Sequence, residues 1–273
     1  MTSVTDKTQT TSESPQSKPS VQSKPSAPKP EAPLRIRYRI RFSKTDLLRW
    51  ISHRDLARLW ERLIRRAQLK PSMTEGFHPK PRIGFPSALA LGVESHDEVV
   101  ELDLAEEPTP QELLQKLADD KQPGLSIISV AKLPEGFGKA QLTQSDYVIT
   151  VAEGCDVDVI QTAIDKLMSQ ESVTVQRKKK PLVVDPKVQI SALAPDGDHL
   201  LLSLAASDGA SLKPTDVLDL LGFNDWIENG SLITRTRVHL QREPETNDPA
   251  TFVAAANLPP QEQSNLSTEG DQQ

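Results

Sequence analysis

The sequence predicts an α+β protein built from two tandem ferredoxin-like halves, each with the order β-α-β-β-α-β, flanked by disordered tails. Segments with a two-residue apolar period and segments with a 3.6-residue period follow one another in that order over residues 34–133. The same order recurs over residues 146–241, after a linker at 134–145 that contains the glycine-rich run EGFGK. The two ends of the chain have a different composition, which sets the limits of the folded part.

Both ends of the chain have a composition that is typical of disorder. Residues 1–33 consist largely of Ser, Thr, Pro, Lys and Gln, and the pentapeptide QSKPS occurs at 16–20 and again at 22–26. Residues 242–273 carry six acids against a single arginine. Such segments bury too little apolar surface to offset the entropy lost on ordering. We therefore expect residues 1–33 and 242–273 to be disordered tails, the second of them acidic.

The first half is expected to begin with an alternating strand at 34–42 and a helix behind it. In the strand, arginines alternate with apolar residues, so the apolar set faces a core and the arginines face the opposite side. The helix begins at Ser52, a good N-cap with Asp55 three residues on. Its apolar stripe has the spacing of a buried helical face: Leu56, Leu59, Trp60, Leu63, Ile64 and Ala67. Strands at 82–85, 98–104 and 125–133, and a helix from Thr109 or Pro110, complete this half.

The second half is expected to repeat this order with less clearly defined middle strands. We predict strands at 147–152, 173–176, 200–206 and 232–240, while 182–190 holds one strand or two short ones. Helices are predicted at 157–168 and 214–221. In the latter, Pro214 suits the first turn and Gly222 suits the C-cap.

A basic block lies within an acidic protein. The chain has a net charge of −6, but residues 34–82 hold 14 Lys and Arg against four acids, a local charge of +10. This asymmetry suggests an anionic partner such as nucleic acid, although the acidic C-terminal tail could cover the block within the same molecule. The candidate nucleic-acid-binding residues are Arg35, Arg37, Arg39 and Arg41 of the strand, and Arg54, Arg58 and Arg65 of the helix.

Three interpretations of the strand arginines remain open. Spaced about 6.8 Å apart along one face, they can follow phosphates on the open face of a ferredoxin-like sheet. In that topology, however, the neighbouring strand places Glu101 and Asp103 opposite them, so cross-strand ion pairs would neutralise the row. Packing of this face against the second half is the third interpretation.

The start of the first helix is a second candidate site, formed by Ser52, His53 and Asp55. Backbone N–H groups at a helix start favour an anion and a neutral imidazole. His53 is therefore a candidate for phosphate binding or acid–base chemistry. The alternative is a histidine that packs or hydrogen-bonds at the helix start.

The loop GFHPKP at 76–81 is the most distinctive local motif. Gly76 permits an unusual backbone conformation, and the two prolines stiffen the chain. We expect Phe77 to anchor the loop, which leaves His78 and Lys80 held outward for a ligand or partner. A purely structural turn is the alternative. Because the loop follows the far end of a helix about 22 Å long, His53 and His78 need not share a site.

Several short motifs in this block resemble, in the same order, a bacterial radical-SAM-linked family of unknown function. They are SHRDL at 52–56, Arg62 with RRA at 65–67, EGFHPKP at 75–81 and ALGVES at 90–95. In that family the domain is either fused behind a radical-SAM enzyme or occurs as a separate protein. The resemblance implies a radical-SAM protein as partner, with RNA or the ribosome as a further contact. It implies no catalytic residues, and it assigns the iron–sulfur ligands to the partner.

The single cysteine, Cys155, limits the chemistry available to this chain. It cannot form an internal disulfide, and by itself it cannot supply a Cys-based zinc site or an iron–sulfur cluster. Asp55, Glu75 and His78 show no metal-ligand spacing, so we expect no metal and no cofactor. The N-terminal residues lack the apolar run of a signal peptide, and no stretch reaches the roughly 20 apolar residues of a membrane span. We therefore expect a cytoplasmic protein without a membrane segment.

The sequence thus favours a non-catalytic binding or adaptor protein that presents RNA or a ribosome-related substrate to a radical-SAM partner. No complete catalytic constellation is visible, so an enzyme is the less favoured class. Two alternatives remain. One is a protein-interaction module without nucleic-acid binding, and the other is a metal-independent RNA-processing enzyme that uses His53 or His78.

Overall fold

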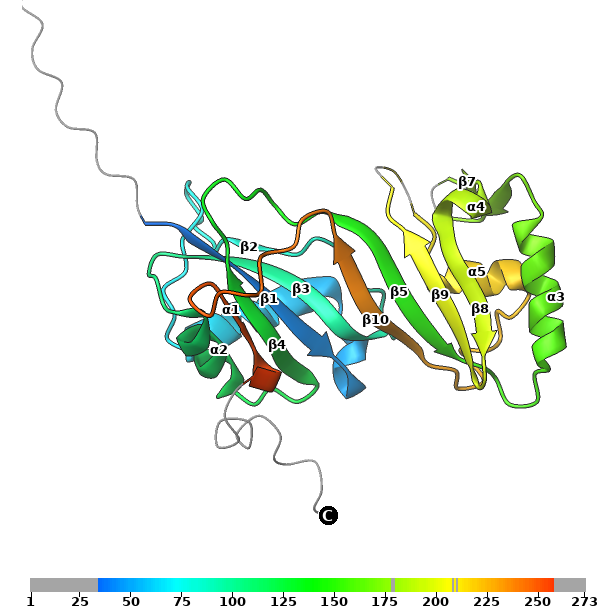
Figure 1. The fold of residues 1–273 in the computed structure, drawn as a ribbon, viewed down its shortest axis with the longest axis horizontal. Helices are drawn as coiled ribbons and strands as arrows, with labels where there is room; N and C mark the ends of the chain where they lie inside the picture. Colours follow the sequence, from blue (N-terminus) through cyan, green and yellow to red (C-terminus); the bar gives the residue numbers. More distant parts are fainter. Residues whose placement is uncertain (1–33, 178–179, 208, 210, 258–273) are drawn as a thin grey trace, which may run out of the picture. The chain divides into compact units, whose positions relative to one another are not determined.

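A computed structural model describes residues 34–177, 180–207, 209 and 211–257 of this chain (Figure 1). The tail predicted at 1–33 lies outside the described residues, as does the part of the acidic tail from 258 onward. The described residues belong to one compact unit.

The first half of the chain forms four strands and three helices, in nearly the predicted order. They are β1 (Ile36–Lys44), the 3-10 helix η1 (Asp46–Trp50), α1 (His53–Arg66), β2 (Ile83–Gly84), β3 (Glu94–Leu104), α2 (Pro110–Ala118) and β4 (Leu125–Lys132). Ser52 caps α1 by accepting a hydrogen bond from the Asp55 backbone N–H, as expected. Strand β3 begins four residues earlier than predicted and η1 was not predicted, because neither residues 94–97 nor residues 46–50 have a distinct apolar period.

The second half forms the elements from β5 to β10, and here the middle segment differs from expectation. They are β5 (Leu142–Thr150), α3 (Val157–Met168), β6 (Val173–Val175), β7 (Leu182–Val184), α4 (Pro186–Gln189), β8 (Ile190–Asp196), β9 (His199–Ala205), α5 (Pro214–Leu221) and β10 (Ile233–Leu240). The range predicted to hold one or two strands instead holds β7 and α4, with β8 beginning at its last residue. Gly222 ends α5 at a φ of +84°, as its C-cap role requires.

Most of the strands join in a single mixed sheet (Figure 1). Its order is β11-β4-β1-β3-β10-β5-β9-β8, where β11 is Phe252–Ala254 near the end of the described chain. Strand β2 pairs with part of β3, while β6 and β7 form a separate two-stranded sheet. The α+β class is therefore confirmed. The sequence did not predict the continuity between the halves, which arises because β10 pairs in parallel with the start of β3.

Two hydrophobic cores lie along this sheet. The first contains Tyr38, Ile40 and Phe42 of β1 together with the predicted apolar stripe of α1, in which Trp60 is fully buried. The second contains Trp226 and the apolar faces of α3 and α5. Each half therefore buries its own tryptophan, and β3 and β10 carry the sheet from one core to the other.

Two predicted boundaries need correction. Strand β5 begins at Leu142, inside the segment predicted as a linker. Residues 242–257, predicted to belong to a disordered tail, cross the sheet and end in β11 (Phe252–Ala254) and the 3-10 helix η2 (Ala255–Asn257). Strand β11 pairs with β4 and extends the sheet by one strand.

Candidate nucleic-acid interface

The arginines of β1 form cross-strand ion pairs with acids of β3. The register places Arg37 opposite Asp103 and Arg39 opposite Glu101. Arg35 and Arg37 both bind Asp103, at 2.6 and 3.2 Å, and Arg39 binds Glu101 at 2.9 Å. Arg41 binds Asp97, at 2.5 Å. The cross-strand pairing interpretation therefore describes the contacts of this row.

Two segments from elsewhere in the chain lie over the middle of the row. Arg37 donates to the Gly138 carbonyl at 2.8 Å, and the Arg39 guanidinium lies 5.4 Å from the ring centroid of Phe137. Arg39 also donates to the Arg242 carbonyl, while Arg41 pairs with Glu243 at 2.6 Å. As a result the Arg39 side chain is only 3% exposed. Arg39 is thus unavailable to an external phosphate, which corrects its place among the predicted nucleic-acid-binding residues.

The arginines on the outer face of α1 are in a different state. Arg54, Arg62 and Arg65 are exposed, and none has an ion pair or side-chain hydrogen bond within the described part of the chain. Arg58 makes an open contact with Asp55 at 3.3 Å, with both side chains more than half exposed. Since ion pairs of this kind are weak, the face of α1 presents cations that are free to contact an anionic partner.

The start of α1 does not form an acid–base pair. The Ser52 hydroxyl donates to the Asp55 carboxylate at 2.7 Å, and this hydrogen bond, helped by Arg58, lowers the pKa of that carboxyl. His53 is exposed and contacts the ring of Phe85 edge-on at 5.2 Å. Within the described residues it has no polar partner that would orient its imidazole. The geometry thus gives Asp55 a capping role and gives His53 no general-base partner.

The loop after α1 is a tight hairpin that is closed by backbone contacts and by the Thr74 hydroxyl. Thr74 and Lys80 exchange two hydrogen bonds, at 2.8 and 3.0 Å, and Met73 pairs with Pro81. Gly76 at the tip has a φ of +114°, a conformation that side-chain-bearing residues rarely adopt. Phe77 is 101% exposed, so the prediction that its ring anchors the loop is wrong. His78 and Lys80 are exposed, as expected.

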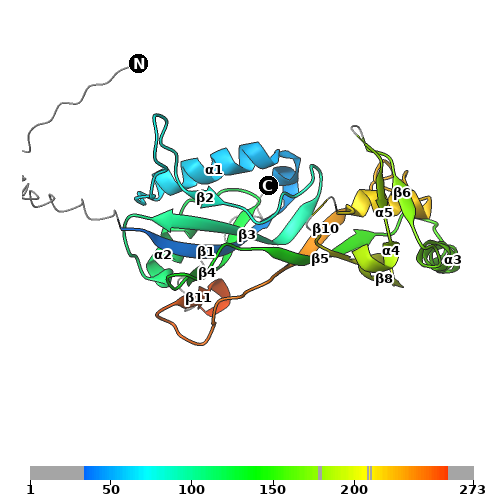
Figure 2. The ribbon, with the colours of Figure 1, turned by 90° about the horizontal axis from the view of Figure 1, so that it is seen from above.

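This hairpin and α1 lie on the same side of the sheet (Figure 2). The chain after the hairpin returns toward the start of α1, where Phe85 meets His53. His53 and His78 make no contact with each other in the described structure, so they do not form a shared site. We call the free arginines of α1 together with the hairpin and its exposed Phe77, both on this side of the sheet, the helix–hairpin surface.

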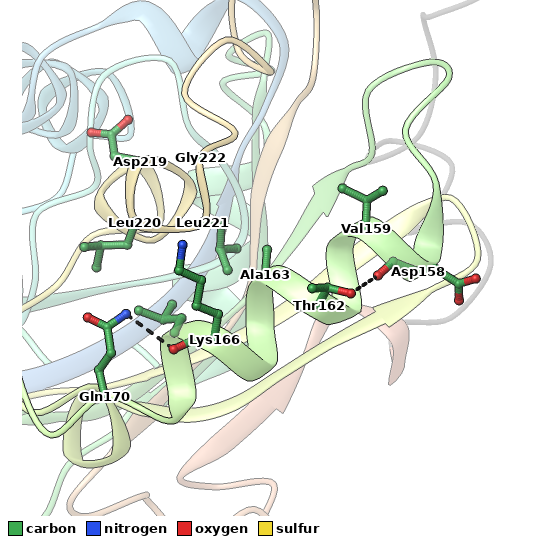
Figure 3. A pocket seen from close by; sticks show the side chains of 11 residues that line it. Asp158, Val159, Thr162, Ala163, Lys166, Gln170, Asp219, Leu220, Leu221 and Gly222 are labelled. Carbon is green, nitrogen blue, oxygen red and sulfur yellow. Dashed lines mark hydrogen bonds between the residues drawn. The ribbon is translucent and has the colours of Figure 1, made fainter.

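Two concave regions were not indicated by the sequence. One is a groove of about 570 Å³ between α3 and α5, whose lining includes Lys166 of α3, Gln170 just after that helix, and Asp219 and Leu220 of α5 (Figure 3). Burial raises the pKa of Asp219, and the neighbouring Asp216 adds to this effect. The other is a pocket of about 450 Å³ above Arg39 and Arg41, closed on one side by residues 243–252. Because both depend on elements that are distant in sequence, no local pattern could have revealed them.

Within the described residues, no group of three or more His, Cys, Asp or Glu side chains is placed to hold a metal ion. In the same part of the chain, no helix combines the length and the apolar character that a membrane crossing needs.

The fold and the surface together define an α+β protein with an extended mixed sheet and a basic, helix-borne face. The chain belongs to the family described as "Uncharacterized protein conserved in bacteria (DUF2344)", whose model matches residues 37–214. This range contains α1, the hairpin and most of the large sheet. The comparison with curated proteins gave no match.

Among solved structures, the chain is similar to one chain of the "Crystal Structure of a Cbf5-Nop10-Gar1 Complex". The two share 10% sequence identity at a TM-score of 0.38, over 74% of this chain and 48% of that chain. This chain therefore spans about half the length of that one, and we base no argument on the likeness.

Proposed function

We propose that this chain is a non-catalytic binding protein that holds RNA or a ribosome-related substrate for a radical-SAM partner in the cytoplasm. The observation that carries the proposal is the helix–hairpin surface, where Arg54, Arg62 and Arg65 are exposed and have no ion pair in the described structure. Unpaired arginines on one helix face supply the electrostatic contact with phosphates that nucleic-acid binding requires.

The hairpin adds a second type of contact to this surface. Single-stranded RNA bases stack on exposed aromatic rings, and such stacking tolerates any sequence. The Phe77 ring is fully exposed at the tip of a hairpin that the hydrogen bonds between Thr74 and Lys80 hold closed. The hairpin therefore loses little conformational entropy when a base stacks on this ring. His78 and Lys80 beside it offer further polar contacts.

The proposal of a radical-SAM partner rests on the sequence motifs rather than on the geometry of the structure. The segments 52–56, 75–81 and 90–95 lie within the range matched by the family model. Two of them form the start of α1 and the hairpin, so the residues that carry the resemblance are also those that build the proposed surface.

The same proposal treats each half as a ferredoxin-like unit. In the first half β4, β1 and β3 are neighbours and β2 pairs with β3, while in the second half the order is β10-β5-β9-β8. Numbered within each half, with β8 and β9 as strands two and three, both follow the order 4-1-3-2 of that topology. The repeated order supports a duplicated unit that is joined through β10 and β3.

The test is binding of the full-length protein to a fluorescent 20-nucleotide single-stranded RNA of mixed sequence across a salt series. The triple variant Arg54→Ala, Arg62→Ala, Arg65→Ala is expected to flatten the slope of log K against log salt. The slope should change by about 0.7 for each phosphate that no longer has an arginine partner. Phe77→Ala should weaken binding about 5- to 150-fold, as expected for one stacked base at about 1–3 kcal/mol.

The matched control is Lys166→Ala, Lys187→Ala, Lys213→Ala, which removes three exposed cations from the second half. It changes the net charge by the same amount and should leave the salt slope close to that of the wild type. Equal slopes for the two triple variants, or binding that does not respond to salt, would refute the helix–hairpin surface as the RNA site.

A further inference from the structure

We infer that the pocket above Arg41 is a separate site for a small phosphate ester, and that the carboxylate of Glu243 occupies the phosphate position in this structure. The pocket lies over the face of the sheet that carries the β1 arginines, whereas α1 packs on the other face. Figure 2 shows α1 on one side of the sheet and the segment that leads into β11 on the other. The inference therefore goes beyond the proposed RNA surface and does not depend on it.

The walls of the pocket combine basic, acidic and apolar side chains, the acids being Asp97 and Glu243. Arg41 of β1, His96 of β3 and Arg237 of β10 line one part of it. Ile128 of β4 and Phe252 of β11 line another part. The volume of about 450 Å³ falls within the range usual for small-molecule sites. Such a lining suits a molecule with an anionic group at one end and a flat or apolar body at the other.

The balance of charge on the sheet leaves a cation without a partner. Arg39 is paired with Glu101, and Arg41 is paired with Asp97, so two acids of β3 serve these two arginines. Arg237 lines the same pocket and is exposed, and within the described residues it has neither an ion pair nor a side-chain hydrogen bond. Asp146, which stands opposite Arg237 in the register with β5, binds His239 instead, at 2.6 Å. Arg39 and Arg41 therefore each have an acid of β3, whereas Arg237 has no ion pair in the described structure.

The missing negative charge comes from the segment that covers the pocket. Glu243 reaches Arg41 at 2.6 Å and lies 3.8 Å from Arg39, while its own side chain remains 44% exposed. Phosphate oxygens bind guanidinium groups with the same charge-assisted geometry as carboxylate oxygens. An incoming phosphate could thus replace Glu243 at Arg41 and also engage Arg237, which Glu243 does not contact.

Displacing Glu243 would not require a strand to unpair. Between β10 and β11 the covering segment forms only bends and turns, and its internal contacts centre on Asp248. Phe252, at the start of β11, stays paired opposite Ala131 of β4 and would form a fixed wall for the apolar part of the ligand.

The test is isothermal titration of the full-length protein with adenosine monophosphate, with inorganic phosphate, and with a short single-stranded RNA as separate ligands. We expect adenosine monophosphate to bind, and Glu243→Gln to tighten its dissociation constant about tenfold because the competing carboxylate charge is removed. Arg237→Ala, at an exposed position, should weaken binding about tenfold or more. Glu245→Gln, in the same segment but without an ion pair in the described structure, is the matched control and should bind like the wild type.

Each other result would count against the inference. Lack of binding of adenosine monophosphate to both the wild type and Glu243→Gln at millimolar concentration would overturn it. Inorganic phosphate binding as tightly as the nucleotide would remove the role of the apolar wall. Binding of RNA alone would assign the arginines to a polymer, and equal effects of Glu243→Gln and Glu245→Gln would show a general charge effect.

Discussion

Three buried charged side chains, Lys44, Glu98 and Arg235, lie where β3 meets β10. Arg235 and Glu98 are 2% and 3% exposed and pair at 2.5 Å. Lys44 is 1% exposed and donates to the Arg49 carbonyl. Burial lowers the pKa of Lys44, and the negative charge of Glu98 partly opposes this decrease. Burial also disfavours the charged form of Arg235, but the attraction of Glu98 outweighs burial and raises the pKa of Arg235. Glu98 therefore acts as the counter-charge for two buried cations.

Replacing Glu98 should be among the most damaging single changes in the chain. Glu98→Gln keeps the shape but leaves Arg235 and Lys44 without their anion, and breaking a buried pair costs about 3–5 kcal/mol. Urea unfolding of the full chain measures this loss. Glu61→Gln, on the exposed face of α1, is the control and should change the free energy of unfolding by no more than about 0.5 kcal/mol. A loss below about 1 kcal/mol for Glu98→Gln would contradict the role of Glu98 as the counter-charge for the two buried cations.

Individual residues also show where local sequence reasoning failed. Phe77 was expected to be an anchor because large aromatic rings are usually buried. The hairpin, however, is closed by Thr74 and Lys80, so its tip needs no side-chain anchor. His78 and Lys80 were expected to point outward, and both are exposed, as befits residues near the tip of a hairpin.

At the scale of elements, the ends of the helices follow from capping residues. Thr109 and Glu112 form a reciprocal capping box at the start of α2, with Glu112 accepting from the Thr109 N–H at 2.8 Å. This hydrogen bond lowers the pKa of the Glu112 carboxyl. Both partners lie three residues apart, which is why the sequence placed this helix start at Thr109 or Pro110.

Thr109→Ala should destabilise the protein by about 1 kcal/mol, because the backbone N–H of Glu112 loses its side-chain acceptor. Chemical denaturation at neutral pH measures this value, and Lys116→Ala on the same helix is the control.

The pKa of Glu112 is depressed in the folded state, so the ionised carboxylate contributes its full stabilisation of the folded state only above the usual pKa of a glutamate. That contribution is lost as the pH falls through the lowered value. The Thr109 hydroxyl also donates to this carboxylate, at 3.0 Å, and Thr109→Ala removes that bond while it keeps the backbone N–H. The difference in unfolding free energy between wild type and Thr109→Ala should therefore narrow in acid, and a constant difference would argue against the hydroxyl–carboxylate bond.

The elements that the sequence missed are those without a period of their own. Strand β11 has three residues, and it forms only because β4 offers an unpaired edge. Strand β5 extends into the expected linker because β9 and β10 pair with it on both sides. In both cases the partner strand, rather than the local pattern, sets the limits of the element.

At the scale of the whole molecule, a narrow connection joins two cores. The parallel pairing of β10 with β3 includes Thr234 with Glu94 and Arg235 with Ser95, and the Glu98–Arg235 pair lies beside it. Trp60 reports on the first core and Trp226 on the second, whereas Trp50 is 55% exposed. The tryptophans therefore allow the stability of the two halves to be followed separately.

We expect the two halves to unfold together as long as this connection is intact. In Trp50→Phe, Trp226→Phe the fluorescence reports Trp60, and in Trp50→Phe, Trp60→Phe it reports Trp226. Both variants should lose their signal over the same range of urea as the far-ultraviolet circular dichroism, since coincident transitions indicate a cooperative unit. Adding Arg235→Met, which removes the buried pair, should separate the fluorescence transition of each variant from that of its circular dichroism. Transitions that already differ with Arg235 in place would show that the halves fold independently.

The sequence by itself determined the α+β class, the positions of α1, α2, α3 and α5, and the exposure of the α1 arginines. These features depend on residues within a few positions of one another, through apolar periodicity and capping. It also indicated that Glu101 and Asp103 could neutralise the β1 arginines, because strand alternation fixes which face each side chain occupies.

Only the tertiary structure decided which arginines remain free. Arg41 meets Glu243 across 202 positions of sequence, and Arg39 is covered by Phe137 and Arg242. It also decided that β10 would join β3 and make one sheet from two halves. Such contacts form because segments that are distant in sequence have complementary strand edges and charges once each half has folded. A local sequence pattern does not predict them.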